Sequence, residues 1–441
     1  MHRQQERGTI AMEASHRSTA SPKNALAGQW KALFLCLFAT VAVYIPYVGY
    51  STQIPQMMDE LGMSYSQVGW LASAAALMGG IIILFAGIVT DRWGAKNVML
   101  LGLAICAVGQ LLFSYMPNFE WLLASRLLVG IGIPLLYIAP FAMAVRWFEK
   151  SDKIAISLGI MSSCDGIGTL MALYGFAYIL LAYGWRTGSA IGALIVLGML
   201  VVTFAFLKEP PGYKDVQKEV YRKGIWKEYF SVIGKKNIFM MAAFMIGVWG
   251  SYAIAVYWVP TILIEDAGWS ASLAGLLGAL YPVVGIAGAI SAGVVSDRIG
   301  KRKPLILLSG IGMTLSFLGL AWAQSTSSHY VLFAAMLGAA GLFSYVGMPL
   351  CYTLAADTVG AQYAATANGV LLSVGMLIGG VVYPLALGYI KDATQSYNWG
   401  FIAAAISLVV LSVVSAVIAR DVRTSESATS RTVEASAGLE A

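Results

Sequence analysis

The chain carries two ionisable side chains, Arg126 and Asp165, well inside long apolar segments, where a charge usually marks a pathway or a partner. Arg126 lies about seven residues from one end of its segment, hence roughly 10 Å deep at 1.5 Å per residue. Asp165 lies roughly 14 Å below the same face of a ~30 Å hydrocarbon core. Because these depths agree, we hypothesise that the two form a proton-responsive or anion-holding pair in a central cavity. The alternatives are a static buried ion pair and an Arg126 side chain that reaches outward.

Aromatic residues in the same segments could complete a binding cavity, because tyrosine combines an apolar face with a hydroxyl group. Tyr44 and Tyr47 are three residues apart and therefore share one helix face. Some of these aromatic residues will instead serve only in helix packing. Besides Arg126 and Asp165, the candidates for the solute and proton pathway are Tyr44, Tyr47, Trp249, Tyr252, Tyr257, Tyr281, Tyr345 and Asn368.

The residue pattern does not favour an enzyme. The three histidines and four cysteines have no metal-binding spacing, and the sequence contains no nucleophile elbow and no phosphate-binding loop. We therefore expect no catalytic residue, no metal, no cofactor and no ATPase activity. The cysteines all lie inside apolar segments, so they indicate no disulfide framework.

The composition indicates an all-α integral membrane protein. The 441 residues are 59% hydrophobic and only 11% charged, whereas soluble domains carry roughly 25% charged residues. The apolar segments are about 20 residues long, which is enough to cross a bilayer as helices. The twelve predicted transmembrane helices are 31–52, 66–90, 97–116, 119–144, 154–182, 187–207, 238–263, 270–296, 304–324, 330–355, 364–390 and 399–419.

The basic residues predict the orientation of these helices. All but three of the 28 Lys and Arg residues lie in the two tails and in the loops that follow even-numbered helices. Cytoplasmic loops retain positive charge, so both termini are expected in the cytoplasm. The net charge of +6 then reflects topology, with anionic lipid headgroups as contacts and without nucleic acid binding. We expect a monomer in the plasma membrane, which in a bacterium is the inner membrane, and no signal peptide.

The expected organisation is two helical bundles with a linker and two tails. The tail 1–28 precedes a six-helix bundle at 29–207, and a cytoplasmic linker at 208–237 leads to a second bundle at 238–420. The end of the chain, 421–441, is expected to be disordered. The middle of the linker is either an amphipathic helix on the membrane surface or a solvated tether.

The two bundles are predicted to be copies of one unit. The segment that begins Gly87-Ile-Val-Thr-Asp91-Arg92 recurs 206 residues later, beginning Gly293-Val-Val-Ser-Asp297-Arg298. Two parallel halves in an apolar chain are one way to build an alternating-access carrier. Each copy must turn between two spanning helices in six or seven residues, which favours glycine, and each places a carboxylate at a helix end. The residues of this repeated loop are Gly87, Asp91, Arg92, Gly94, Lys96, Gly293, Asp297, Arg298, Gly300 and Arg302.

These motifs resemble those of the major facilitator superfamily. Both copies match its G-x-x-x-D-R-x-G-x-[K/R] signature, Arg126-Leu-Leu-Val-Gly130-Ile-Gly132 is similar to its fourth-helix motif, and Gly184-Trp185-Arg186 is also familiar from it. The resemblance implies that the repeated loop is a conformational latch, with Asp91 against the start of the eleventh helix. It also implies a role for Arg126 in proton coupling. The alternative for the loop is charge that only sets topology.

The resemblance implies a secondary carrier of a small solute that works by rocking of two six-helix halves. The stretch Ala365-Thr366-Ala367-Asn368-Gly369 is loosely similar to bacterial organic-anion and cyanate-type permeases. We therefore expect proton-coupled import of a small, monocarboxylate-like organic anion. The alternatives are proton-coupled efflux of drugs or metabolites, and a membrane sensor that no longer transports.

Overall fold

The computed structural model describes residues 22–149, 151, 153–210, 232–325, 330–360 and 363–421, which are almost entirely helical and contain no strand. Residues 22–28, which were predicted to belong to the N-terminal tail, are helical and form the start of α2. The rest of that tail, the C-terminal tail beyond residue 421, and most of the linker with its expected amphipathic helix lie outside the described residues. The elements are α2 (Pro22–Val48), η1 (Gly49–Gln53), α3 (Ile54–Leu61), α4 (Tyr65–Trp93), α5 (Ala95–Tyr115), α6 (Phe119–Phe148), α7 (Ile154–Ser162), α8 (Cys164–Leu170), η2 (Met171–Gly175), α9 (Phe176–Phe206), α12 (Lys236–Ala253), η3 (Ile254–Trp258), α13 (Val259–Ala267), α14 (Ala271–Ile299), α15 (Lys303–Ser325), α16 (Tyr330–Val359), α17 (Ala364–Val374), η5 (Gly375–Gly379), α18 (Gly380–Thr394), α19 (Asn398–Leu408), η6 (Val409–Val414) and α20 (Ser415–Ile418).

Several of these elements join into single membrane-crossing helices. The first span is α2–η1–α3, the fifth begins with α7, α8 and η2, the seventh is α12–η3–α13, the eleventh is α17–η5–α18 and the twelfth is α19–η6–α20. The segments η2, η3, η5 and η6 are π-helical, whereas η1 is a 3₁₀ helix. Single π-helical turns are rare and often occur at functional sites.

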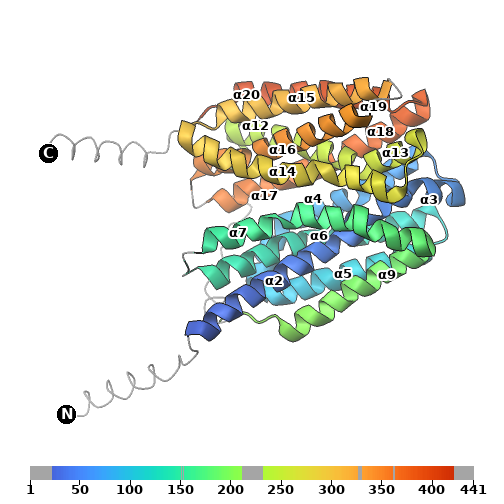
Figure 1. Cartoon of the computed structure of the whole chain (residues 1–441). Coiled ribbons are helices and arrows are strands. Elements are labelled where there is room, and N and C mark those ends of the chain that lie inside the picture. Colours follow the sequence, from blue (N-terminus) through green and yellow to red (C-terminus); the bar gives the residue numbers. More distant parts are fainter. Residues whose placement is uncertain are drawn as a thin grey trace, which may run out of the picture.

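The described residues form twelve helical spans, as the sequence predicts. Among the described residues, eleven helical stretches are long and apolar enough to span a membrane, and the longest is Ile156–Phe206 with 51 residues. At 1.5 Å per residue that stretch would be ~76 Å long, more than twice a ~30 Å core. It is broken at Gly184, whose φ of 75° and ψ of 163° are not helical, so it makes two crossings, and the chain reverses direction there (Figure 1).

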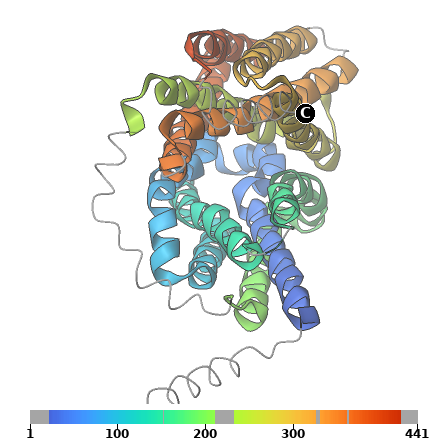
Figure 2. The ribbon, with the colours of Figure 1, turned by 90° about the vertical axis from the view of Figure 1, so that its left-hand side faces the viewer.

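The helices form two halves. The N-terminal half, α2 to α9, lies below the C-terminal half, α12 to α20, in Figure 1, and the helices are seen end-on in Figure 2. The repeat is visible in matching elements. Helices α4 and α14 both have 29 residues, both begin after a serine whose hydroxyl accepts an amide hydrogen bond, and both end at a glycine. This arrangement of parallel six-helix repeats confirms the predicted fold class.

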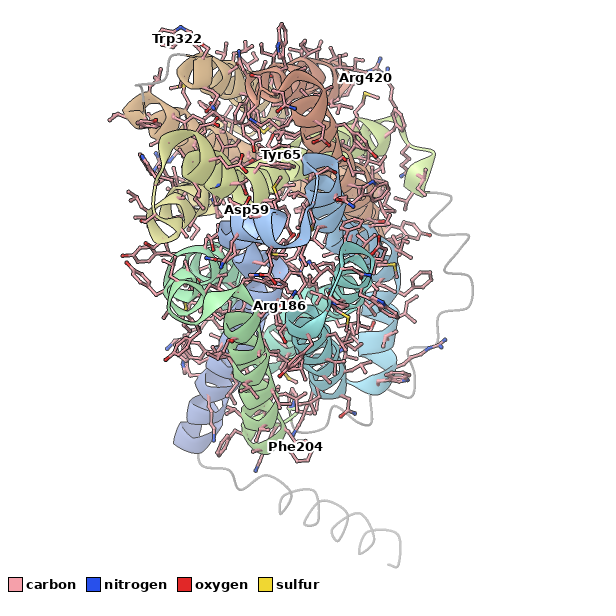
Figure 3. The ribbon with its side chains drawn as sticks, turned by 90° about the vertical axis from the view of Figure 1, so that its right-hand side faces the viewer. Asp59, Tyr65, Arg186, Phe204, Trp322 and Arg420 are labelled. Carbon is pink, nitrogen blue, oxygen red and sulfur yellow. The ribbon has the colours of Figure 1, made fainter. Side chains whose placement is uncertain are left out.

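The two ends of the bundle differ in charge. The basic end is the end at which α2 begins and α20 ends (Figure 1), and it includes Lys96 and Arg302. The acidic end is the opposite one, with Asp59, Glu60 and Glu265 among its residues, and Figure 3 looks onto it. We use these two names below.

The halves pack together through a few helices with small residues. Helix α4 lies against the eleventh span, and α14 lies against α8 and η2. A Cβ atom on Gly69 of α4 would lie 2.7 Å from the carbonyl oxygen of Pro384, so only glycine permits this approach. Hydrogen bonds also cross here: the Ser73 hydroxyl donates to the Val381 carbonyl at 2.8 Å.

Candidate functional site

The carboxylate of Asp165 lies at the boundary between the two halves. Asp165 lies in the first turn of α8. Oδ1 accepts hydrogen bonds from the hydroxyls of Tyr44 at 2.9 Å and Tyr252 at 3.3 Å, and Oδ2 accepts one from Tyr345. Tyr44 belongs to α2 of the same half, whereas Tyr252 and Tyr345 belong to α12 and α16 of the other. One carboxylate therefore connects both halves through three phenol groups.

Two further hydroxyls extend this network. The hydroxyls of Tyr44 and Tyr137 lie 2.6 Å apart, and those of Thr169 and Tyr252 lie 3.3 Å apart. The sequence analysis did not select Tyr137, which lies on α6. A signal existed, because Tyr137 follows Arg126 by 11 positions, which is close to three helical turns and places both on one face.

The aromatic candidates surround this network in two groups of ring contacts. In the C-terminal half, the ring centroids of Trp249 and Tyr252 are 5.8 Å apart, those of Tyr252 and Tyr281 are 6.2 Å apart, and those of Tyr281 and Tyr345 are 6.3 Å apart. Closer to the acidic end, the Tyr257 ring contacts that of Tyr47 at 6.1 Å. All of these rings are buried, so the centre is closed and largely aromatic.

One polar group in this centre, Trp249 Nε1, is buried without a hydrogen-bond partner among the described residues. The hydroxyls of Ser251 and Ser344 lie beside the Tyr281 hydroxyl and interact with it. Buried polar groups are nearly always paired, so unpaired ones call for a ligand, a water or a rearrangement.

Among the described residues Arg126 forms no ion pair with Asp165 in this conformation, so the hypothesis that the two act as a pair in the cavity stays a prediction. Arg126 is fully buried, but its guanidinium donates to the carbonyls of Pro46 and Tyr47, the latter at 2.6 Å, and lies 4.4 Å from the centre of the Tyr50 ring. These carbonyls lie at the end of α2, where a helix leaves acceptors unpaired. The depth estimate gives the position of a side chain across the thickness of the membrane but not the direction in which it points around the helix.

Asn368 is placed separately from the Asp165 network. It lies on α17 and is half-buried, and its Oδ1 atom is buried without a hydrogen-bond partner in the described part of the chain. It is not among the residues that bond to Asp165 within the described part of the chain.

The first copy of the repeated loop lies at the basic end. Gly94 has a φ of 85°, which other residues resist. Asp91 accepts a hydrogen bond from Arg146 of its own half at 3.0 Å and is 56% exposed. Lys96 donates through its ammonium to the Phe204 carbonyl at 2.8 Å. The expected contact of Asp91 with the start of the eleventh helix stays a prediction for another conformation.

The second copy has similar geometry. Gly300 has a φ of 67°, and Asp297 and Arg298 are exposed at the end of α14. Arg302 forms an ion pair with Asp357, which lies in the same half. Gly87 and Gly293 have open space where a Cβ would lie, so packing does not explain why glycine occupies these two positions.

The structure contains a cavity of about 410 Å³, but it lies away from Asp165. It opens near the acidic end between η1, α3, α9 and the start of α14, and Gln53, Leu181 and Trp269 are among its lining residues. The Asp165 network is instead tightly packed. We therefore assign the candidate site to this central network, which would have to open to admit a solute.

The twelve-helix fold with a charged, tyrosine-lined centre defines a membrane transport protein built from two repeats. The family model of the Major Facilitator Superfamily matches residues 36–370 and 251–440, and the chain belongs to this family. Family membership places it among secondary transporters and not among enzymes.

Related proteins are similar to this chain over most of their length. The chain is 25% identical to a probable sulfoacetate transporter of Cupriavidus necator, over 83% of this chain and 88% of the relative. It is 24% identical to monocarboxylate transporter 12 of Xenopus laevis, over 87% of both chains. A bacterial homologue of the human lysosomal transporter Spinster, solved inward-facing and unoccupied, has a similar fold with a TM-score of 0.72, 17% identity and coverage of 91% of this chain and 98% of that one.

Proposed function

We propose that the protein imports a small, monocarboxylate-like organic anion together with a proton, by alternating access. The observation that carries this proposal is the Asp165 carboxylate in the middle of the bundle, which accepts hydrogen bonds from both halves. The names of the relatives, for sulfoacetate and for monocarboxylates, support a small organic acid as the solute. In this proposal the protein is a monomer in the plasma membrane, with its basic end in the cytoplasm against anionic headgroups.

Charge explains why the anion and the proton would bind together. A second carboxylate placed 4 Å from an ionised Asp165 would be repelled by about 4 kcal/mol at an effective dielectric constant of 20. Protonation of Asp165 removes this repulsion and gives its carboxyl group an O–H donor for the incoming anion. The anion and the proton therefore favour each other, which produces symport. A cationic drug would instead compete with the proton for Asp165, which would produce antiport.

The hydrogen bonds explain how protonation would affect the two halves. An ionised carboxylate only accepts hydrogen bonds, so it suits three phenol donors at once. A protonated carboxyl must donate from one oxygen, so at least one tyrosine bond has to rearrange. Because Tyr252 and Tyr345 belong to the C-terminal half, the rearrangement changes contacts between the halves. Proton binding is thereby linked to their relative movement.

In this proposal Arg126 supplies positive potential for the anion. Its guanidinium is buried and donates hydrogen bonds to neutral carbonyls, and its Nε has no hydrogen-bond partner among the described residues. Carbonyl dipoles stabilise a cation without cancelling its charge. An anion that enters the adjacent aromatic region would be attracted by this charge, without the direct Arg126–Asp165 pair that the sequence suggested.

The experiment is uptake into proteoliposomes that contain the purified full-length chain. Labelled acetate, lactate, benzoate and glucuronate are offered with an acidic exterior and, in parallel, without a pH gradient. We expect one of the monocarboxylates to accumulate only when the gradient is present, and to show counterflow without it. Accumulation driven by an acidic interior would indicate efflux, and absence of counterflow for every acid would refute this substrate class.

A further inference from the structure

The acidic end of the bundle holds a second cluster of charged and aromatic residues, outside the Asp165 network. It is centred on the start of α4, where a capping box joins Ser64 and Gln67: the Ser64 hydroxyl accepts from the Gln67 amide at 3.3 Å, and the Gln67 side chain accepts from the Ser64 amide at 2.9 Å. A helix leaves its first four N–H groups without partners in the helix. The amides of Tyr65 and Ser66 therefore need acceptors from elsewhere.

Asp392 of the opposite half supplies these acceptors. Its Oδ1 accepts from the Tyr65 amide at 3.0 Å, and its Oδ2 accepts from the Ser66 amide at 2.8 Å. Both carboxylate oxygens thus lie on the positively polarised start of a helix, where an anion is stabilised. Asp392 lies in the last turn of α18, so the contact joins the first turn of α4 to the last turn of the eleventh span.

The side chain of Tyr65 is held by the same opposite half. Its hydroxyl donates to Glu265 Oε2 at 3.1 Å, and the Tyr397 hydroxyl donates to that same oxygen at 2.6 Å. The Lys391 ammonium lies 3.9 Å from the centre of the Tyr397 ring and 5.4 Å from that of Tyr65, within cation–π range. Burial beside the Glu265 carboxylate raises the pKa of Tyr397, which keeps its hydroxyl protonated as a donor. Figure 3 shows Tyr65 where the two halves meet.

Among the described residues, the corresponding acidic pair of the N-terminal half makes no hydrogen bond or ion pair with the opposite half. Asp59 and Glu60 occupy the positions that match Glu265 and Asp266 in the repeat. Glu60 accepts from Trp185 Nε1 at 2.6 Å and from Arg186 Nε at 2.9 Å, and both donors belong to its own half. Glu60 therefore provides a matched control on the same face of the protein.

We propose that Asp392, Glu265, Lys391 and Tyr397 hold Tyr65 as a latch that keeps the acidic end closed. We call this set of residues the Tyr65 latch. All of its contacts with Tyr65 cross between the halves, so the acidic end can open only when they are released. The latch biases the resting protein toward the conformation that is closed at this end.

The Tyr65 latch has a geometric counterpart at the basic end. Helix α4 and the eleventh span run in opposite directions, so the end of each lies near the beginning of the other. Asp392, near the end of the eleventh span, lies here against the start of α4. Asp91, near the end of α4, is expected to make the reverse contact, but it pairs here with Arg146 of its own half. The same two helices thus carry a carboxylate at each end that can hold the other helix. In this conformation, among the described residues, the carboxylate at the acidic end is engaged across the boundary and Asp91 is not.

The test measures how often the acidic end opens. The reporter is a single cysteine in place of Ala76, which is buried between the halves against Gly380. The four native cysteines are buried, and the protein without the reporter gives their background. A membrane-impermeant maleimide is applied from the acidic side to full-length protein in oriented vesicles. The measurement needs no solute, so its outcome is independent of the proposed substrate.

We expect Asp392→Asn to increase the labelling rate about tenfold, because it removes charge-assisted hydrogen bonds to two amides. Tyr65→Phe loses only the hydroxyl bond to Glu265 and should increase the rate less, by about threefold. Glu60→Gln should leave it unchanged. The proposal is overturned if Asp392→Asn and Tyr65→Phe both label like the parent protein. It is equally overturned if Glu60→Gln raises labelling as much as they do. If Asp392→Asn does not reach the membrane, the labelling rates of Tyr65→Phe and Glu60→Gln are compared instead, and equal rates overturn the proposal.

Discussion

The hydroxyl of Tyr252 lies 3.3 Å from Oδ1 of Asp165, and this hydrogen bond crosses from one six-helix half to the other. Asp165 is the only carboxylate among the described residues that is both in the middle of a span and bonded to the opposite half. Because of this position, protonation of this one side chain changes the contact between the two halves. The predictions that follow test this relationship and the charges around it.

Replacement of Asp165 by asparagine separates transport from its coupling to protons. The asparagine side chain has nearly the same size as the aspartate but cannot take up or release a proton. We expect accumulation driven by a pH gradient to be lost, while solute exchange across equilibrated vesicles persists. Paired accumulation and counterflow measurements check this. If Asp165→Asn still accumulates solute in response to the gradient, the proton must bind elsewhere.

Removal of single tyrosine hydroxyls distinguishes contacts between halves from contacts within one half. Tyr252→Phe removes a hydrogen bond to a charged acceptor, which is worth about 1.5–3 kcal/mol, so the pH at half-maximal uptake should shift. Tyr137→Phe removes a bond to Tyr44 within the N-terminal half and should shift it less. The measurement is the pH profile of uptake for each variant. Equal shifts would show that the boundary between halves has no special role.

Arg126 should tolerate lysine poorly, even though the charge is kept. The guanidinium reaches the carbonyls of Pro46 and Tyr47 with two nitrogens, whereas a lysine ammonium is a point charge without this fork. We expect Arg126→Lys to lose one of these bonds and about 2 kcal/mol of stability. Thermal unfolding in detergent checks this as a lower Tm. An unchanged Tm with reduced transport would instead indicate a role in solute binding alone.

Asp91 should matter for transport and not for stability. Its ion pair with Arg146 is largely exposed on the Asp91 side, and exposed pairs contribute about 1 kcal/mol or less. Asp91→Asn should therefore leave Tm and membrane levels unchanged and slow uptake, because it removes the expected contact with the eleventh helix in the other conformation. Uptake kinetics equal to those of the parent protein would contradict the latch role of this loop.

Much of the fold was predictable because apolar length and glycine placement are local properties. The predicted second span, 66–90, corresponds to α4 at Tyr65–Trp93, and the reversal between the predicted fifth and sixth spans occurs at Gly184. The spacing of the repeat also predicted that α4 and α14 would match. The π-helical segments were not predictable, because they depend on packing between helices and not on residue type.

The site was less predictable, because a sequence gives the depth of a residue better than the direction of its side chain. Asp165 was selected as an ionisable residue inside a span, and Tyr44, Tyr252 and Tyr345 were selected without any indication that they bond to it. The contacts of Arg126 with the carbonyls of Pro46 and Tyr47 were not predicted, since these carbonyls lie where α2 gives way to the 3₁₀ helix η1, a boundary that the residue pattern does not reveal. The cross-half contacts of Asp392 could not be foreseen without the packing of the halves.

The π-helical segment η3 allows the part of the seventh span that follows it to rotate about the helix axis. Each residue advances an α-helix by about 100°, so converting this wide turn to an α turn would rotate the rest of the helix by about that angle. Tyr252 precedes η3 and Tyr257 lies within it. The conversion would therefore swing Tyr257 away from the Tyr47 ring while leaving Tyr252 on Asp165. The protein could in this way exchange the side chains that face the solute without bending either bundle.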